Sequence, residues 1–184
     1  MKLTASAAAT GLAILALVAS AASFAHSKAQ LDASADRALH HFFALNPANR
    51  DLAKKAAGIL VFSHVSKGGA GVAGEYGQGV LRVNRATVGY YSITAASVGL
   101  TLGFAKYSEV IMFMTQDSLD KFSASRGWSV GGDASVALVS QGAGGQYDTE
   151  TIGKPILGFV FGEKGLLGDV SLEGSKISQI KTDD

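Results

Sequence analysis

The sequence predicts a single α+β domain in which N-terminal amphipathic helices pack on a twisted, glycine-rich, mostly antiparallel β-sheet or open barrel. Apolar residues recur at helical spacing near the N-terminus and alternate with a period of two after residue 58. Glycine accounts for 23 of the 184 residues and proline for only 2, so the glycines belong to ordered structure rather than to a low-complexity tail. With 47% hydrophobic residues, the chain is also apolar enough to form one core.

The first 25 residues have the three parts of a secretory signal peptide. Lys2 precedes an apolar run from Gly11 to Val18. The 25-residue segment as a whole ends in Ser23-Phe24-Ala25, in which small residues stand on both sides of a phenylalanine. The apolar run is shorter than the roughly 20 residues that span a bilayer. We expect cleavage after Ala25, or alternatively after Ala21, and export to a bacterial periplasm or cell surface. A retained anchor helix is the alternative; residues 26–184 would form the single domain.

Two helices are expected before the sheet. Between Ala29 and Phe43 the apolar residues lie on one side of a 3.6-residue period. Asn46 is predicted to cap a second helix, which runs from Pro47 to Ala57 and ends at Gly58. The polar side of the first helix carries Asp32, Asp36, Arg37 and His40.

Strands are predicted from Ile59 onward, where alternation replaces the helical period. Val98–Phe104 places large apolar residues on one face and small residues on the other, and Val110–Met114 is apolar throughout, as in a strand buried on both faces. A short helix over Asp117–Phe122, capped by Asp117 or Thr115, should cover it. The remaining predictions are half-buried strands at Val130–Val136 and Asp169–Glu173, and a mobile loop at Ser140–Asp148.

Composition excludes several kinds of chemistry. Without cysteine the chain forms no disulfide, thiolate metal site or cysteine nucleophile. Its formal net charge of +1 falls to zero once Lys2 is removed, so no general field attracts nucleic acid. His40 and His41 point about 100° apart on a helix and cannot share a metal. The glutamates are scattered without the spacing of an acid–base pair, and we expect no enzymatic activity, cofactor or metal.

Two glycine motifs match functional signatures by accident. Gly69–Gly74 fits the dinucleotide fingerprint, but β-type residues continue to Val83 where that fingerprint requires a helix. Gly127–Gly131 fits the nucleophile elbow of serine hydrolases, but all four histidines precede Ser129. Neither motif therefore predicts a nucleotide site or a hydrolase.

Several glycine blocks occur together in a recognisable order along the chain. The sequence closely resembles the SYLF domain, a lipid-binding domain also known from yeast actin-patch proteins, over about Leu31 to Ile180. The residues that carry the resemblance are Ala57–Phe62, Lys67–Gly71, Gly74–Leu81, Tyr91-Ser92, Gly131–Val136, Lys164–Gly168 and Leu172–Gly174.

The resemblance implies a phospholipid membrane surface as partner, with phosphoinositide-type or other anionic lipids as candidates, and no enzymatic activity. Asp32 and Asp36 beside Arg37 argue against strong selectivity for anionic lipid. Actin is not expected as a partner of an exported protein. Apolar or stem contacts are predicted for Phe42, Phe43, Lys54 and Lys55, and phosphate contacts for Lys67, Arg82 and Arg85.

Two other interpretations remain open at this point. One is a structural or stress-related envelope protein that acts through a protein partner. The other is a small outer-membrane β-barrel, for which eight strands of about ten residues would nearly fit the length. The N-terminal helices and the terminal Lys181–Asp184, which lacks a final aromatic residue, argue against the barrel.

Overall fold

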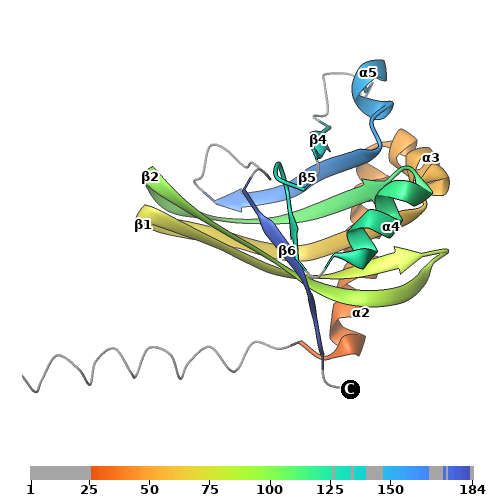
Figure 1. The fold of residues 1–184 in the computed structure, drawn as a ribbon. Coiled ribbons are helices and arrows are strands. Elements are labelled where there is room, and N and C mark those ends of the chain that lie inside the picture. Colours follow the sequence, from red (N-terminus) through yellow and green to blue (C-terminus); the bar gives the residue numbers. More distant parts are fainter. Residues whose placement is uncertain are drawn as a thin grey trace, which may run out of the picture.

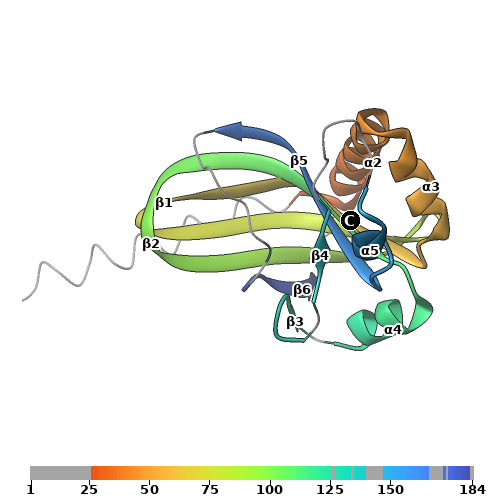
Figure 2. The same cartoon turned by 90° about the horizontal axis from the view of Figure 1, so that it is seen from above.

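The computed structural model describes residues 26–125, 127–133, 135–139, 147–165, 172 and 174–182, with only the backbone described at 98–102 and 163–165. Two helices precede a curled antiparallel sheet, and a third helix packs on the opposite face of that sheet (Figures 1 and 2). The expected α+β fold with a twisted, half-barrel sheet is confirmed. The predicted signal peptide at residues 1–25 lies outside the described residues.

Helices α2 (Lys28–Leu45) and α3 (Pro47–Lys55) begin at well-formed caps. Ser27 and Gln30 form a capping box at the start of α2, in which each side chain accepts a hydrogen bond from the other residue's backbone N–H. The Asn46 side chain caps α3, with Pro47 at its first position, as predicted. The end of α3 differs from the prediction, because Ala56 is the C-cap and Gly58 already begins the sheet.

Strands β1 (Gly58–Val83) and β2 (Ala86–Phe113) form one long hairpin that is bent in the middle. The register shifts between Ala70 and Val72, where Gly71 has a φ of 75°, a conformation that favours glycine. The bend lies at the end of the hairpin away from the helices, on the left of Figure 1. The hairpin therefore doubles back on itself.

Glycines allow the two halves of β1 to lie against each other. A Cβ atom on Gly79 would lie 2.6 Å from the Val61 carbonyl oxygen, and one on Gly77 would lie 3.1 Å from that of His64. A Cβ atom on Gly69 would collide with the Val72 carbonyl. The glycine excess in this part of the sequence thus serves close backbone approach.

The rest of the sheet is built on the two halves of β2. The first half of β2 pairs through Tyr90–Thr94 with β6 (Lys176–Ile180). The second half pairs through Ala105–Phe113 with β5 (Ile156–Gly165), and both pairings are antiparallel. Short β3 (Trp128–Ser129) pairs with β6, and β4 (Ala137–Leu138) pairs with β5 in the parallel direction. The order is β3-β6-β2-β5-β4, with β1 paired to β2. A four-residue helix, α5 (Thr149–Ile152), precedes β5.

Each face of the sheet has its own core. On one face α2 buries Leu31, Ala35, Ala38 and Phe42 against β-strand residues that include Val61 and Phe159. On the other face α4 (Gln116–Ala124), capped by Thr115, inserts Leu119 and Phe122 beside Phe113 and Trp128. Figure 2 shows α2 and α4 on opposite sides of the sheet.

One strand prediction is wrong. The chain leaves β3 after a bridge at Val130 and turns at Gly131, whose φ is 89°, so Val130–Val136 is not a continuous strand. The Asp133 carboxylate accepts a hydrogen bond from the Ser129 N–H and closes this turn. Most of the predicted loop at 140–148 and of the predicted strand at 169–173 lies outside the described residues.

The strand predictions closer to the hairpin hold. Val110–Met112 is fully buried, and β1 continues through Gly74 to Val83 rather than opening a helix there. The dinucleotide motif therefore lacks the helix N-terminus that a pyrophosphate requires.

Candidate functional site

A groove lies where α2, α3 and the turn of the β1–β2 hairpin meet. Its volume is about 900 Å³, within the range of sites that hold small-molecule ligands. The lining residues come from helix, strand and turn: Asp36, Leu39, His40, Phe43, Arg50, Ala53, Lys54, Ala56, Ala57, Gly58, Ile59, Arg82, Asn84 and Arg85. We refer to this site as the helix groove.

The helix groove combines apolar side chains with cations. Leu39, Phe43 and Ile59 are half-buried and supply apolar surface. The Arg50 guanidinium lies 5.3 Å from the centre of the Phe43 ring, a cation–π contact that holds a charge beside the apolar surface. Such a lining suits an amphipathic ligand whose charged part is negative.

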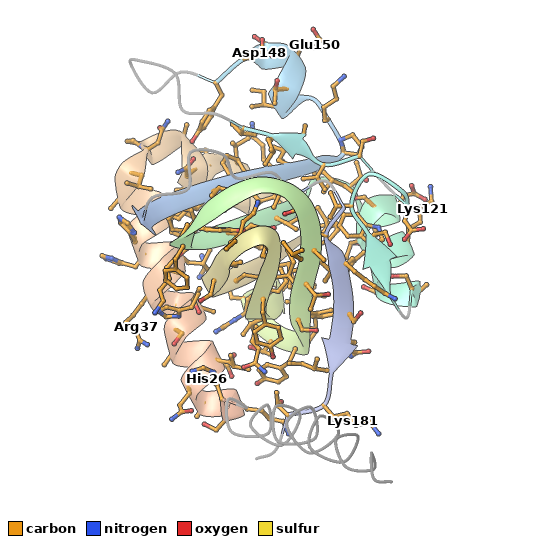
Figure 3. All side chains as sticks on the ribbon, turned by 90° about the vertical axis from the view of Figure 1, so that its left-hand side faces the viewer. His26, Arg37, Lys121, Asp148, Glu150 and Lys181 are labelled. Carbon is orange, nitrogen blue, oxygen red and sulfur yellow. The ribbon has the colours of Figure 1, made fainter. Side chains whose placement is uncertain are left out.

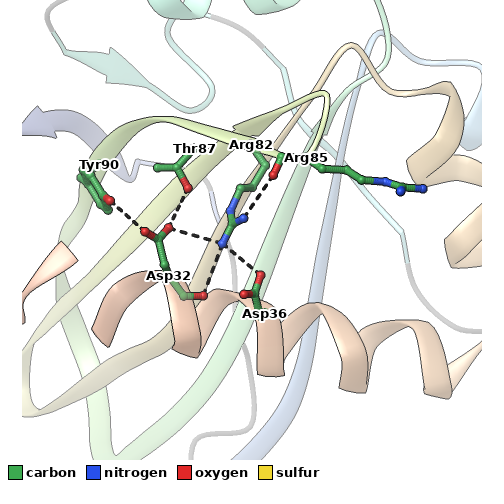
Figure 4. A network of polar contacts seen from close by, with 6 residues as sticks. All are labelled: Asp32, Asp36, Arg82, Arg85, Thr87 and Tyr90. Carbon is green, nitrogen blue, oxygen red and sulfur yellow. Dashed lines mark hydrogen bonds and ion pairs between the residues drawn. The ribbon is translucent and has the colours of Figure 1, made fainter. Parts of the chain in front are cut away.

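Arg82 is fixed by acidic residues of α2 (Figure 4). Its Nη2 atom lies 3.3 Å from Asp32 Oδ1 and 2.9 Å from Asp36 Oδ1. Asp32 also accepts hydrogen bonds from the Thr87 hydroxyl at 2.6 Å and the Tyr90 hydroxyl at 3.0 Å. These contacts attach α2 to the hairpin and balance the charge of Arg82. Asp32 is thus a structural anchor rather than part of a solvated helix face.

Arg85 occupies the two-residue hairpin turn. It and Asn84 have φ values of 69° and 50°, the left-handed pair that two-residue hairpin turns require. Its carbonyl oxygen accepts a hydrogen bond from Arg82 Nη1 at 3.3 Å, whereas its side chain points away from the acidic residues (Figure 4). The turn therefore presents the Arg85 guanidinium to the groove without a described carboxylate partner.

The structure brings together four of the seven residues predicted to bind lipid. Phe43, Lys54, Arg82 and Arg85 line the helix groove. Lys55 is exposed on α3 but does not line it.

Phe42 and Lys67 have other roles. Phe42 is 1% exposed and packs against Phe159 and Phe161, which corrects its assignment as a lipid contact, since a core side chain does not reach a membrane. Lys67 is half-buried, and its Nζ atom lies 4.0 Å from Glu75 Oε2. Lys67 therefore has an acidic neighbour on the same strand, and it does not line the helix groove.

Arg50 is the groove cation that the sequence reasoning missed. It precedes Lys54 by four residues, so both lie on the same side of α3. The four-residue spacing on a predicted helix could have indicated that Arg50 lies beside Lys54. Lys54 itself forms an exposed ion pair with Asp51 at 2.9 Å.

Two carboxylates of the hairpin are buried, Glu75 on β1 and Glu109 on β2. Glu109 is fully buried, and neither of its oxygens has a hydrogen-bond partner among the described residues. Burial and then the neighbouring Glu75 raise the pKa of Glu109 well above its ordinary value. The pKa of Glu75 is also raised by burial, against the opposing effects of Tyr107 and Lys67.

The described residues contain no group of three or more His, Asp or Glu side chains placed to hold a metal ion. No helix in the described ranges is long and apolar enough to cross a membrane.

Comparison with known families gives one match. Residues 94–184 match the family model described as "Ysc84: Las17-binding protein actin regulator", the SYLF domain. That family is linked to actin and lipid binding. No curated protein matches the chain. The residues lining the helix groove precede the matched segment, whereas most of β2, with β5 and β6, lies within it. The match confirms the predicted resemblance to the SYLF family over residues 94–184, whereas residues 31–93 of the predicted range lie outside it.

Proposed function

We propose that this protein is a non-enzymatic phospholipid-binding protein of the bacterial envelope that attaches reversibly to membranes through the helix groove. The observation that carries the proposal is the groove itself, in which Arg50, Lys54 and Arg85 surround apolar side chains of α2, α3 and β1. A lipid headgroup with its upper acyl chains has the same division between anionic and apolar parts. The link of the family to lipid binding supports the proposal.

The charges of the groove fit reversible rather than permanent attachment. Arg82 is balanced by Asp32 and Asp36, which leaves Arg50, Lys54 and Arg85 as the cations that face a membrane. Each cation near an anionic surface contributes about 1 kcal/mol, so three contribute about 3 kcal/mol. Because Asp51 offsets part of the Lys54 charge, Arg50 and Arg85 supply most of the attraction.

Vesicle sedimentation tests this function. The full chain is mixed with phosphatidylcholine vesicles, with and without 30% phosphatidylglycerol, at low and high salt. We expect pelleting that increases with anionic lipid and decreases with salt. The double variant R50Q/R85Q removes two groove cations and should weaken vesicle affinity by about 10- to 30-fold.

The matched control is K121Q, which removes an exposed cation of α4 on the other side of the sheet. It should pellet like the unchanged chain. Absence of pelleting with every lipid composition, including a total bacterial lipid extract, would overturn the proposal. Equal weakening by R50Q/R85Q and K121Q would overturn the assignment to the groove.

Export is a second part of the proposal and rests on the signal-peptide pattern of residues 1–25. Expression in a bacterial host followed by intact mass measurement of the envelope fraction tests it. We expect a chain that begins at His26 or Ala22. An unprocessed chain confined to the cytoplasm would contradict export, and actin would then have to be considered as a partner.

A further inference from the structure

A second cavity lies on the other flank of α2, away from the helix groove. Its volume is about 280 Å³, and it is lined by His26, Leu31, Ser34, Ser63, His64, Ser66, Tyr76, Gly77 and Gln78. These residues come from the start of α2 and from both halves of β1. No residue lines both this cavity and the helix groove. We refer to it as the histidine pocket.

Most of the residues that line the histidine pocket carry a side chain with a hydrogen-bonding group. Ser34, Ser63, Ser66 and Tyr76 contribute hydroxyls, and His26 and His64 contribute imidazoles. None of the described residues that line it is Asp or Glu. The His64 ring lies 3.3 Å from the Ser63 hydroxyl, and the His26 ring lies 3.1 Å from the Gln78 amide oxygen. Both rings are therefore held at the pocket wall by neutral partners.

Two further cations, Arg37 and Lys106, lie close enough to the pocket to act on the His64 ring. The Arg37 guanidinium donates a hydrogen bond of 2.8 Å to the Ser34 hydroxyl, which places its charge beside a lining residue. Figure 3 shows Arg37 on α2 and His26 near the start of that helix. Lys106, on β2, lies over the Phe104 ring at 5.6 Å.

These positive charges act on the His64 ring. Burial lowers the pKa of His64, and the positive charges of His26, Arg37 and Lys106 lower it further. No carboxylate is among the groups that act on His64. Protonation of His64 is thus opposed by its partial burial and by three neighbouring positive charges, and a bound anion would offset the effect of those charges.

The chemistry of the lining selects the class of ligand. A divalent metal would meet only two imidazoles and a surrounding positive field. An acyl chain could contact Leu31 and the carbon atoms of the polar side chains, but it would leave the hydroxyls and imidazoles of the lining without hydrogen-bond partners. A compact oxyanion, by contrast, accepts hydrogen bonds from hydroxyls and imidazolium groups and is attracted by the cations.

We propose that the histidine pocket binds the phosphoryl group of a phosphomonoester, at a site separate from the helix groove. The same chemistry is offered by a lipid headgroup and by a soluble phosphate ester. Binding couples to proton uptake at His64, so affinity increases as the pH falls.

The test uses the full chain and NMR titration of the histidine rings at constant ionic strength. Sulfate is the first probe, because its charge does not change between pH 6 and pH 8 and any pH dependence then belongs to the protein. We expect saturable shifts at His64 and His26, with at least threefold tighter binding at pH 6 than at pH 8. Chloride at the same ionic strength is the reference.

Three variants locate the site. H64Q should remove the pH dependence, and R37Q should weaken sulfate binding about three- to tenfold without altering a lining residue. H41Q changes an exposed α2 histidine that does not line the pocket and should bind like the unchanged chain. Absence of saturable sulfate binding, or equal binding by H64Q, R37Q and the unchanged chain, would overturn the proposal.

The source of the phosphoryl group is resolved with two further probes. Glycerol 3-phosphate is the soluble ester, and vesicles of phosphatidic acid in phosphatidylcholine carry the same group on a membrane. If one of these two probes binds and R37Q weakens that binding, the result supports the pocket and identifies whether the phosphoryl group comes from a soluble ester or from a lipid. Sulfate binding alone, with neither ester bound, would overturn the assignment to phosphomonoesters. Because sulfate and glycerol 3-phosphate involve no membrane, this result is independent of vesicle attachment through the helix groove.

Discussion

The two flanks of α2 differ in how their cations are balanced. Toward the hairpin turn, Arg82 is held by Asp32 and Asp36, and the contact fixes the helix to the sheet. Toward the first half of β1, Arg37 contacts only a serine hydroxyl in the described structure, and the pKa of His64 is lowered by burial and by the positive charges of His26, Arg37 and Lys106. Paired cations on one flank stabilise the fold, whereas the cations of the other flank remain available to an anion.

Both flanks depend on the close approach of the two halves of β1, because Arg82 lies in one half and His64 in the other. Replacing Gly79 with Ala separates the halves, since the new Cβ would lie 2.6 Å from the Val61 carbonyl oxygen. We expect the largest loss here, about 3 kcal/mol of unfolding free energy in urea titration. Gly74→Ala is the control, because a Cβ there has nothing within 4 Å; equal losses for both variants would contradict the argument.

Asp32→Ala tests whether the hairpin-turn flank is the structural one. The change removes the hydrogen bonds from Thr87 and Tyr90 and leaves Arg82 with Asp36. We expect a loss of about 2 kcal/mol in urea unfolding. Ser34→Ala, on the pocket flank, should cost less than about 0.5 kcal/mol. A larger loss for Ser34→Ala than for Asp32→Ala would reverse the comparison.

Glu109 provides the opposite case, because it is a buried carboxylate for which the described residues supply no ion pair or hydrogen bond. Its pKa is raised in the folded chain, so the unfolded chain releases this proton at lower pH than the folded chain does. The stability contributed by protonated Glu109 is complete below the unfolded pKa and declines as the pH rises toward the folded pKa. At pH 8 the unfolding free energy of Glu109→Gln, measured by urea titration, should therefore exceed that of the unchanged chain by about 1 kcal/mol.

The matched control for Glu109→Gln is Glu150→Gln, an exposed glutamate of α5. It should follow the pH dependence of the unchanged chain. If Glu109→Gln lost stability at pH 8 relative to pH 5 as steeply as the unchanged chain, burial of Glu109 would not be the cause.

A smaller effect is expected at the pocket itself. Arg37 lowers the pKa of His64, so Arg37→Gln should move that pKa back toward its ordinary value. Histidine ring shifts recorded across a pH titration measure the change. Lys121→Gln should leave the titration of His64 where it is; a downward shift in Arg37→Gln would mean that the guanidinium does not act on this ring.

The smallest effect is expected for Asp51→Asn on α3. Lys54, through a hydrogen bond and its charge, lowers the pKa of Asp51, but both side chains are exposed. Exposed pairs of this kind contribute little to folding, and the urea midpoint should not change measurably. A clear loss of stability would show that the helix-groove flank depends on its exposed pairs as well as on Arg82.

Local patterns were sufficient for the existence of α2, α3 and α4 and of the sheet, but not for the end of α3 or for the short α5. Asn46 followed by Pro47 located the start of α3, and Thr115 was one of the two predicted caps of α4. Alternation failed at Val130–Val136, because glycine at residue 131 permits a turn that a period of two does not reveal. The candidate site was predicted in part: helical spacing placed Phe42 and Phe43 together but did not decide which ring faced the sheet.

The sequence by itself determined the fold class, the caps and the family resemblance, because these depend on residues that are close in the chain. Only the tertiary structure decided that Asp32 anchors Arg82, 50 positions away, and that Lys67 lies beside Glu75. It also decided that Arg50 and Arg85 meet in one groove and that His26 and His64 meet in one pocket. The physical reason is the bend of the β1–β2 hairpin, which stacks two halves of one strand and so brings distant residues onto the two flanks of α2.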